Sequence, residues 1–258
     1  MTAWAEGSLT PRPGAAPAGR MLATQTRTEL TLALRNGEQV LLTLVIPLGL
    51  LVVLTLVPFV AVPDGVRRVD FFVPGVLALA VMSSAFTGQA IATGFERQYG
   101  VLKRLGATPL PRSVLLCAKT LAVLAVELLQ LALLCLVGLL LGWHPHGDPL
   151  SVVALVVLGT AAFSGLGLLL GGTLSGLTTL AVANLVWFVL LVLGGVLFGL
   201  DAFGAAEPVL RLLPTAALSS GLRTVLLSGG ALPVRDALAL AVCALVALAV
   251  ASRTFSWE

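Results

Sequence analysis

The sequence predicts an all-α integral membrane protein with six transmembrane helices. Hydrophobic residues make up 58% of the 258 residues and charged residues only 10%, whereas soluble domains are about 45–50% apolar. The apolar residues are also gathered into runs long enough to cross a bilayer, which takes roughly 20 residues of helix. Because lipid offers no partner for polar backbone groups, each run is expected to be helical.

Six apolar runs define the expected spans, within a membrane domain that covers residues 40–258. The runs lie near residues 40–62, 71–93, 114–141, 150–174, 177–200 and 232–251. Glycines four residues apart let helices approach closely, and we expect them to mark packing within one bundle. Such pairs are Gly138/Gly142, Gly167/Gly171, Gly172/Gly176 and Gly195/Gly199. No internal repeat of the kind found in many secondary transporters is visible.

The segment before the first span divides into two parts. Residues 1–20 mix proline with glycine and alanine and lack the charged start and apolar core of a signal peptide, so we expect a disordered tail. Residues 21–39 are expected to form an amphipathic helix, with Leu30 and Leu34 on one side and Arg27 on the other. Such a helix would lie along the cytoplasmic membrane surface; a simple extension of the first span is the alternative.

The distribution of Lys and Arg predicts that both termini are cytoplasmic. With a cytoplasmic N-terminus, five basic residues fall on the outer side and the inner side holds Arg12, Arg20, Arg27, Arg35, Arg97, Lys103, Arg104, Arg112 and Arg253. The charged stretch at residues 95–113 then forms the main cytoplasmic loop. Arg outnumbers Lys strongly, which is typical of a GC-rich genome, and we expect a multi-pass protein of a bacterial plasma membrane.

Several classes of chemistry lack the residues that they require. Lys119 precedes a threonine but has no upstream glycines to cradle a phosphate, and no catalytic triad, zinc motif or disulfide framework can be assembled. His144, His146 and Asp148 could be imagined as metal ligands, but a turn at the membrane surface beside Trp143 explains them better. We therefore predict no catalytic residue, no metal site and no nucleic-acid partner.

The cytoplasmic loop reads FERQYGVLKRLGATPLPRS over residues 95–113. Val101, Leu102 and Leu105 would form the apolar edge of a short helix, with Lys103 facing away from it. Prolines that begin at Pro109 would prevent this helix from running straight into the third span. A short amphipathic helix on a stiff mount can press into the groove of a partner. A solvated, positively charged loop explains the composition equally well.

The order of residues in this loop resembles the signature of the ATP-binding-cassette (ABC) type-2 exporter permeases, the family of the daunorubicin-resistance membrane subunits. Members carry Glu, then Gly, then Thr-Leu-Lys-x-Leu, then Thr-Pro-Leu-Pro and a later Lys. The matching positions here are Glu96, Gly100, Leu102, Lys103, Leu105, Thr108, Pro109, Leu110, Pro111 and Lys119. Two departures are Gln98, where a second acid is common, and Val101 in place of Thr.

The resemblance covers the chain from about Met21 and implies a permease subunit that works with a separate cytoplasmic ATPase. ATP and Mg would bind to that partner, and this chain would bind no cofactor. Two six-span subunits, identical or related, would form the transport unit, which moves a hydrophobic or amphipathic drug, antibiotic or lipid outward. The residues expected to couple the permease to the ATPase are Glu96, Gly100, Val101, Leu102, Lys103, Leu105, Thr108 and Pro109.

Polar residues inside the spans give candidates for a substrate path. They are Glu127, Gln130, Asn184 and Trp187, and hydrogen bonding between helices is the alternative role for each. Since an ionisable group is costly in the membrane, Glu127 should face the bundle or a cavity. It also supports a rival hypothesis, an ion-coupled secondary transporter with Glu127 as the proton carrier. A membrane scaffold without transport activity is a third possibility.

The last outer loop, at residues 201–236, holds more apolar residues than a solvated loop would. We expect short helices there that dip partway into the outer leaflet.

Overall fold

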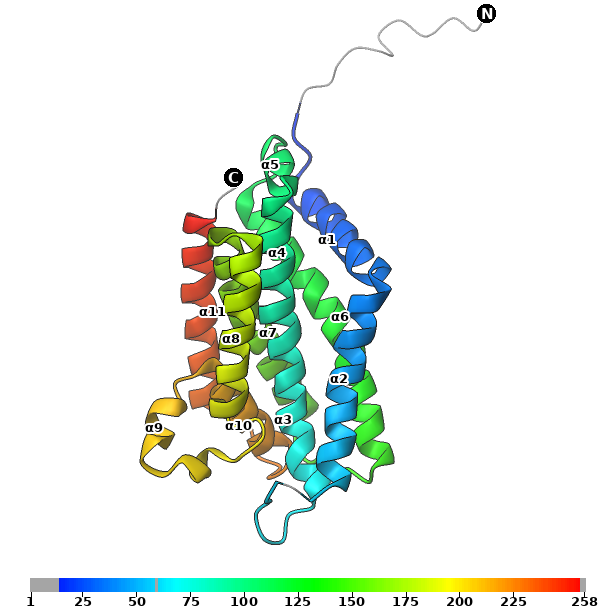
Figure 1. Ribbon diagram of the computed structural model, residues 1–258, viewed down its shortest axis with the longest axis vertical. Helices are drawn as coiled ribbons and strands as arrows, with labels where there is room; N and C mark the ends of the chain where they lie inside the picture. The colour runs from blue at the N-terminus through cyan, green and yellow to red at the C-terminus, as the bar shows by residue number, and fades with distance from the viewer. Residues whose placement is uncertain (1–13, 59, 256–258) are drawn as a thin grey trace, which may run out of the picture.

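The computed structural model describes residues 14–58 and 60–255, and the regular elements among them are all helices (Figure 1). The N-terminal half contains α1 (Ala18–Arg35), α2 (Gly37–Leu56), α3 (Arg68–Met82), the π-helix η1 (Ser83–Gly88), α4 (Gln89–Gln98) and α5 (Val101–Gly106). The C-terminal half contains α6 (Arg112–Leu140), α7 (Pro149–Thr173), α8 (Gly176–Leu193), the 3₁₀-helix η2 (Leu200–Ala206), α9 (Glu207–Leu210), α10 (Pro214–Leu226) and α11 (Val234–Thr254). The predicted all-α class is confirmed.

The described helices include five that are long and apolar enough to cross a membrane. They are the continuous helix formed by α3, η1 and α4, together with α6, α7, α8 and α11. The apolar part of α2, residues 43–56, supplies a sixth, shorter segment. Each of the six expected apolar runs therefore contains one of these helical segments, and the chain is a multi-pass membrane protein.

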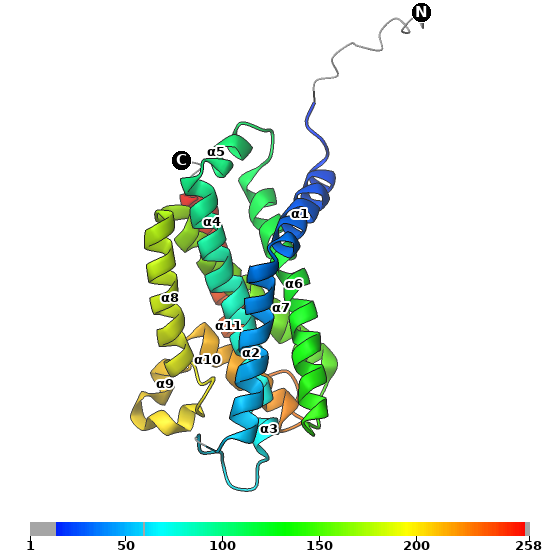
Figure 2. The ribbon, with the colours of Figure 1, turned by 45° about the vertical axis from the view of Figure 1, so that its right-hand side comes forward.

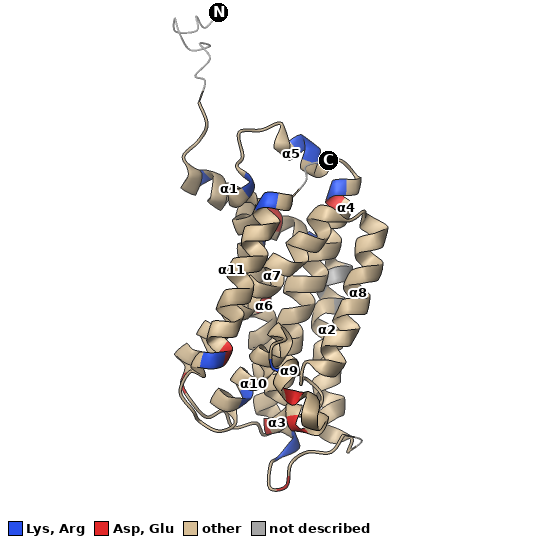
Figure 3. Cartoon of the chain, turned by 90° about the vertical axis from the view of Figure 1, so that its left-hand side faces the viewer, with Lys and Arg blue, Asp and Glu red and all other residues tan. Residues whose placement is uncertain are grey.

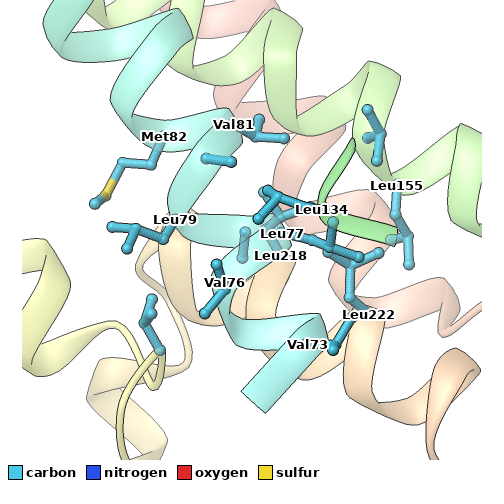
Figure 4. Close-up of a cluster of buried hydrophobic side chains, with 14 of the residues drawn as sticks. Val73, Val76, Leu77, Leu79, Val81, Met82, Leu134, Leu155, Leu218 and Leu222 are labelled. Carbon is cyan, nitrogen blue, oxygen red and sulfur yellow. The ribbon is translucent and has the colours of Figure 1, made fainter. Parts of the chain in front are cut away.

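The helix made of α3, η1 and α4 forms the centre of the bundle. In its most apolar stretch 89% of the residues are buried, against 22% in α8 and 28% in α6 and in α11. Its core side chains, among them Val73 and Leu77, meet Leu134, Leu155 and Leu218 from α6, α7 and α10 (Figure 4). The outer helices instead present leucine and valine outward, as expected for surfaces that face lipid.

The close approach of α7 to the central helix depends on two glycines. A Cβ atom on Gly167 would lie 2.7 Å from the Phe86 carbonyl oxygen, and one on Gly171 would lie 2.5 Å from that of Ala90. Because these obstacles are backbone atoms, only glycine permits this spacing. The Gly167/Gly171 pair thus packs helices within the bundle, as predicted from its spacing.

The helix α8 ends at Leu193, seven residues before the predicted end of its span. Gly195 has a left-handed backbone (φ 71°) that terminates the helix. The Ser219 hydroxyl donates to the Gly194 carbonyl at 2.8 Å, and the Arg223 guanidinium donates to the carbonyls of Gly195 and Val196. Since Gly195 and the glycine at 199 lie beyond the helix, the prediction that this pair packs helices is wrong.

The helix α2 ends at Leu56, six residues before its predicted boundary, because another arginine satisfies its last carbonyl groups. The Arg68 guanidinium donates to the carbonyls of Leu54 at 2.6 Å, Val57 at 2.7 Å and Val60 at 2.8 Å. A cation at the C-terminal end of a helix also complements the helix dipole. Hydropathy cannot locate such an end, because the residues beyond it are still apolar.

The last long loop, which the sequence predicts on the outer side, contains the short helices that its apolar residues predict. After η2 and α9, α10 packs against α3, α7 and α11. Leu218, Leu222 and Val225 of α10 are fully buried by these neighbours. Thus α10 is part of the bundle core rather than of a solvated loop.

The N-terminal helix begins at Ala18 and ends at Arg35, with Asn36 separating it from α2. Of the tail expected over residues 1–20, positions 1–13 lie outside the described residues and 18–20 form the first turn of α1. The helices α1 and α5 and the C-terminal end of α11 lie at one end of the bundle (Figures 1 and 2). The α5 end also carries a concentration of Lys and Arg (Figure 3).

Candidate functional site: the α5 surface and the main pocket

A glycine with a left-handed backbone joins α4 to α5. Gly100 has φ 70°, and its amide donates to the Arg97 carbonyl at 3.0 Å while the Tyr99 amide donates to Phe95 at 2.9 Å. A side chain at this position would meet open space, so the backbone angle alone selects glycine. Gly100 thereby sets the direction in which α5 leaves the central helix.

The expected apolar edge of α5 is divided between two environments. Leu102 is fully buried in a small second core that includes Leu116 of α6 and Phe255. Leu105 is partly buried against the same core, whereas Val101 is 40% exposed. The sequence predicts one apolar edge for all three residues, but only Leu102 and Leu105 pack against the core.

The outward face of this region forms a continuous exposed surface, which we call the α5 surface. Its exposed residues are Tyr99, Val101, Lys103, Arg104, Thr108 and Pro109. The Thr108 hydroxyl donates to the Leu105 carbonyl at 2.6 Å and so closes the end of α5. Pro111 then begins α6 as its N-cap residue. Five of the eight predicted coupling positions therefore lie on this surface or on the turns that fix it, and Leu102 and Leu105 anchor it.

Glu96 faces in a different direction from the α5 surface and belongs to a charge cluster. Its carboxylate oxygens lie 2.7 and 2.8 Å from Lys119 Nζ, which is also 3.0 Å from Glu29 Oε2. Gln25 donates from Nε2 to the other Glu29 oxygen at 2.8 Å. The cluster of Glu29, Glu96 and Lys119 therefore connects α1, α4 and α6.

The three side chains of this charge cluster are largely buried. The side chain of Lys119 is 4% exposed, and those of Glu29 and Glu96 are 13% and 24% exposed. A lysine so far from solvent requires a carboxylate partner, and here it has two. With two carboxylates and one lysine, the cluster consequently carries one formal negative charge in excess.

The charge cluster lines one region of a pocket of about 610 Å³, which we call the main pocket. The walls come from α1, α2, the central helix around η1, α6 and α8. Apolar side chains such as Ile46, Leu79 and Ile91 cover much of it, and Ser83, Ser84 and Thr87 add hydroxyl groups. The hydroxyl-bearing residues belong to the π-helical turn, a feature that often marks functional sites.

The four residues expected on a substrate path divide into two groups. Asn184 and Trp187 line the main pocket, and the Trp187 indole donates to the Ser83 hydroxyl at 2.9 Å. Gln130 lies behind the pocket wall, where it accepts from Ser84 at 3.0 Å and donates to the Thr43 carbonyl at 2.8 Å. Glu127 is fully buried.

Glu127 faces α7 and does not line the main pocket. The Thr160 hydroxyl donates to its Oε2 atom at 2.5 Å. This contact matches the alternative role of hydrogen bonding between helices. The carboxyl groups that do line the pocket are Glu29 and Glu96. Glu29 was not identified from the sequence, because a glutamate on the polar side of a surface helix is ordinary. The one feature that could have indicated a role is Gln25, which lies one turn earlier on the same side of α1 and donates to Glu29.

The histidine region at the opposite end of the bundle is a structural turn. Asp148 accepts from the amides of Leu150 at 3.1 Å and Ser151 at 3.0 Å, and thereby caps α7. These bonds hold the pKa of Asp148 below its ordinary value. His144 contacts Asp70 through its backbone amide at 3.3 Å. Across the described ranges, no three His, Cys, Asp or Glu residues are placed to hold a metal ion.

The fold and the pocket define a polytopic membrane protein with a ligand-sized pocket beside a charged, exposed loop helix. The sequence profile of the family described as ABC-2 type transporter matches residues 22–227. The chain therefore belongs to the ABC-2 type transporter family, and it is a transport subunit of the permease kind rather than a catalytic one. A comparison with curated proteins finds no match to this chain.

Proposed function

We propose that this protein is the membrane subunit of an exporter whose energy comes from a separate cytoplasmic ABC ATPase. The ATPase would bind ATP and Mg, and two permease subunits, identical or related, would form the transport path. The substrate would be a hydrophobic or amphipathic molecule, such as a drug, an antibiotic or a lipid, moved outward across a bacterial plasma membrane. Both termini would be cytoplasmic.

The observation that carries this proposal is the position of α5. Its exposed surface combines a tyrosine, a valine and two basic residues at the end of the bundle where Lys and Arg gather (Figure 3). Basic residues on one side of a membrane protein mark its cytoplasmic side. A partner that binds the α5 surface would thus meet an amphipathic helix held rigidly by Leu102 in the second core.

The same contacts suggest how a push on α5 would reach the membrane domain. Leu102 packs against α6, α7 and α11 through the second core, so α5 cannot move alone. Glu96 lies four residues before Gly100 on the central helix, and its ion pair with Lys119 connects that helix to α6. Closure of the ATPase dimer would accordingly shift α4 relative to α1 and α6, which are walls of the main pocket.

The first test is gentle affinity purification from native membranes, followed by identification of co-purifying proteins and an ATPase assay. We expect a stoichiometric ATPase with the unchanged chain. Gly100→Pro should abolish coupling, because proline fixes φ near −65° and Gly100 requires +70°. Lys103→Glu should weaken association by reversing an exposed charge on the α5 surface.

The matched control is Arg235→Glu, which reverses an exposed charge at the opposite end of the bundle. It should leave ATPase association unchanged. Absence of any ATPase under conditions that keep a known ABC complex intact would contradict the proposed function. Equal losses for Lys103→Glu and Arg235→Glu would show that α5 is not the contact.

A further inference from the structure

We propose that the main pocket binds an amphipathic organic cation, with the positive group beside Glu29 and Glu96 and the apolar body against Trp187 and its neighbours. Binding of such a cation follows from the residues of the pocket. Its export rests on the proposed function, and the transported substrate would then be an amphipathic organic cation.

The sign of the charge in the pocket selects the ligand. Among the described residues that line the pocket, Glu29, Glu96 and Lys119 are the only charged ones. Lys119 already lies within 3.0 Å of one carboxylate and 2.7 Å of the other, so its charge is compensated and the second carboxylate is in excess. Since a buried, uncompensated charge is costly, a ligand cation relieves the cost and a ligand anion increases it.

The remaining walls fit an apolar body. Ile46 on α2, Leu79 on α3 and Ile91 on α4 supply aliphatic surface, and Trp187 on α8 supplies an aromatic ring. The Trp187 indole N–H donates to Ser83, which restrains the orientation of the ring. Aromatic rings attract organic cations through the ring quadrupole, most strongly when the site is dry. The pocket thus offers a second, independent contact that also prefers positive charge.

Unsatisfied polar atoms are a separate indication of a ligand. Thr93 is fully buried, Gln89 is only 4% exposed, and both residues line the pocket. Neither Thr93 Oγ1 nor Gln89 Nε2 has a hydrogen-bond partner in the described part of the protein. Buried polar groups are almost always paired, so this wall of the pocket retains unused hydrogen-bonding capacity.

The experiment compares two ions that share a shape and differ in the sign of their charge. Tetraphenylphosphonium and tetraphenylborate are each measured by equilibrium dialysis against the purified full chain in uncharged detergent, after subtraction of binding to protein-free micelles. We expect saturable binding of the phosphonium with at least tenfold higher affinity than the borate. Equal affinities, or stronger binding of the borate, would overturn the inference.

Variants locate the binding. Glu29→Gln and Glu96→Gln each remove the excess charge while keeping a side chain that can accept from Lys119, so each should weaken phosphonium binding about tenfold. Glu207→Gln is the matched control, because Glu207 pairs with Arg211 at the opposite end of the bundle, and it should change nothing. Loss of affinity in all three variants, or in none, would refute the assignment to this pocket.

Trp187→Leu provides a measurement that does not disturb the charge cluster. It should weaken phosphonium binding several-fold and leave borate binding nearly unchanged, whereas equal weakening of both ions would contradict a cation-selective pocket. A melting curve of each variant confirms that it is folded. Absent cation binding with an intact ATPase complex would refute this inference alone, and cation binding without any ATPase would support the pocket while refuting the proposed function.

Discussion

Replacing Lys119 with methionine removes the only cation in the charge cluster and keeps the length of the side chain. Glu29 and Glu96 would then face each other without a partner, at 13% and 24% exposure. Breaking a buried ion pair by removing one member costs about 3–5 kcal/mol. Both carboxylates line the pocket and keep some exposure there. We therefore expect the free energy of unfolding to fall by a value near the low end of this range, about 3 kcal/mol.

The loss should appear as a fall in melting temperature of the purified chain in detergent. For a chain of this size, each kcal/mol corresponds to about 2–4 °C, so the expected shift is roughly 6–12 °C. Limited trypsin digestion should also cut within α1 sooner, because Lys119 no longer fixes this helix to α6. Lys103→Met is the control, since Lys103 is the other lysine of the chain and is exposed on the α5 surface.

A combined variant tests the cause of the loss. Adding Glu29→Gln and Glu96→Gln to Lys119→Met removes the stranded charges, and more than half of the lost stability should return. If Lys119→Met melts like the unchanged protein, or if the combined variant is no more stable than the single one, the charge cluster does not hold α1, α4 and α6 together.

Three further changes test other parts of the structure. Arg223→Leu removes the donors to two carbonyl groups beyond α8 and should cost about 3 kcal/mol in an unfolding titration, whereas Arg235→Leu, at an exposed position, should cost little. Gly167→Ala brings a Cβ atom within 2.7 Å of a backbone oxygen and should destabilise by about 1–3 kcal/mol, while Gly49→Ala, which meets open space inside α2, should be neutral or stabilising. Glu127→Gln keeps the contact with α7, so transport in vesicles should persist with unchanged dependence on ATP; transport lost together with a requirement for a proton gradient would favour the secondary-transporter hypothesis.

Hydropathy was sufficient to predict the class and the approximate spans, because the cost of polar backbone in lipid leaves helices as the only solution. It could not predict where α2 and α8 end. Those ends depend on Arg68 and on Arg223, which reach carbonyl groups 11 and 28 residues away in the sequence. Because the carbonyl groups that each arginine binds lie in another segment of the chain, nothing in the local sequence indicates these contacts.

For a similar reason, the sequence predicts the local features of the candidate site but not its contacts between distant residues. The loop motif indicated α5 and its glycine correctly, because a left-handed turn and a proline stop are local features. The contact between Glu29 and Lys119 spans 90 residues, and no periodicity within α1 reports it. Glu127 was a candidate as an ionisable residue in a span, but its one recorded hydrogen bond comes from Thr160 of α7 and its Oε1 atom is buried without a partner among the described residues.

Glu96 connects the two halves of the site, since it precedes α5 by one helical turn and also lines the main pocket. A displacement of α5 that moves α4 relative to α6 would change the distance between Glu96 and Lys119, because the ion pair joins these two helices. A cation bound beside Glu96 changes the energy of that same ion pair. By linkage, any ligand that favours one arrangement of the pair must alter the affinity of the α5 surface for its partner by the same factor, and the reverse holds equally. In the proposed transporter, this one carboxylate would couple the pocket to the loop helix without a separate relay across the bundle.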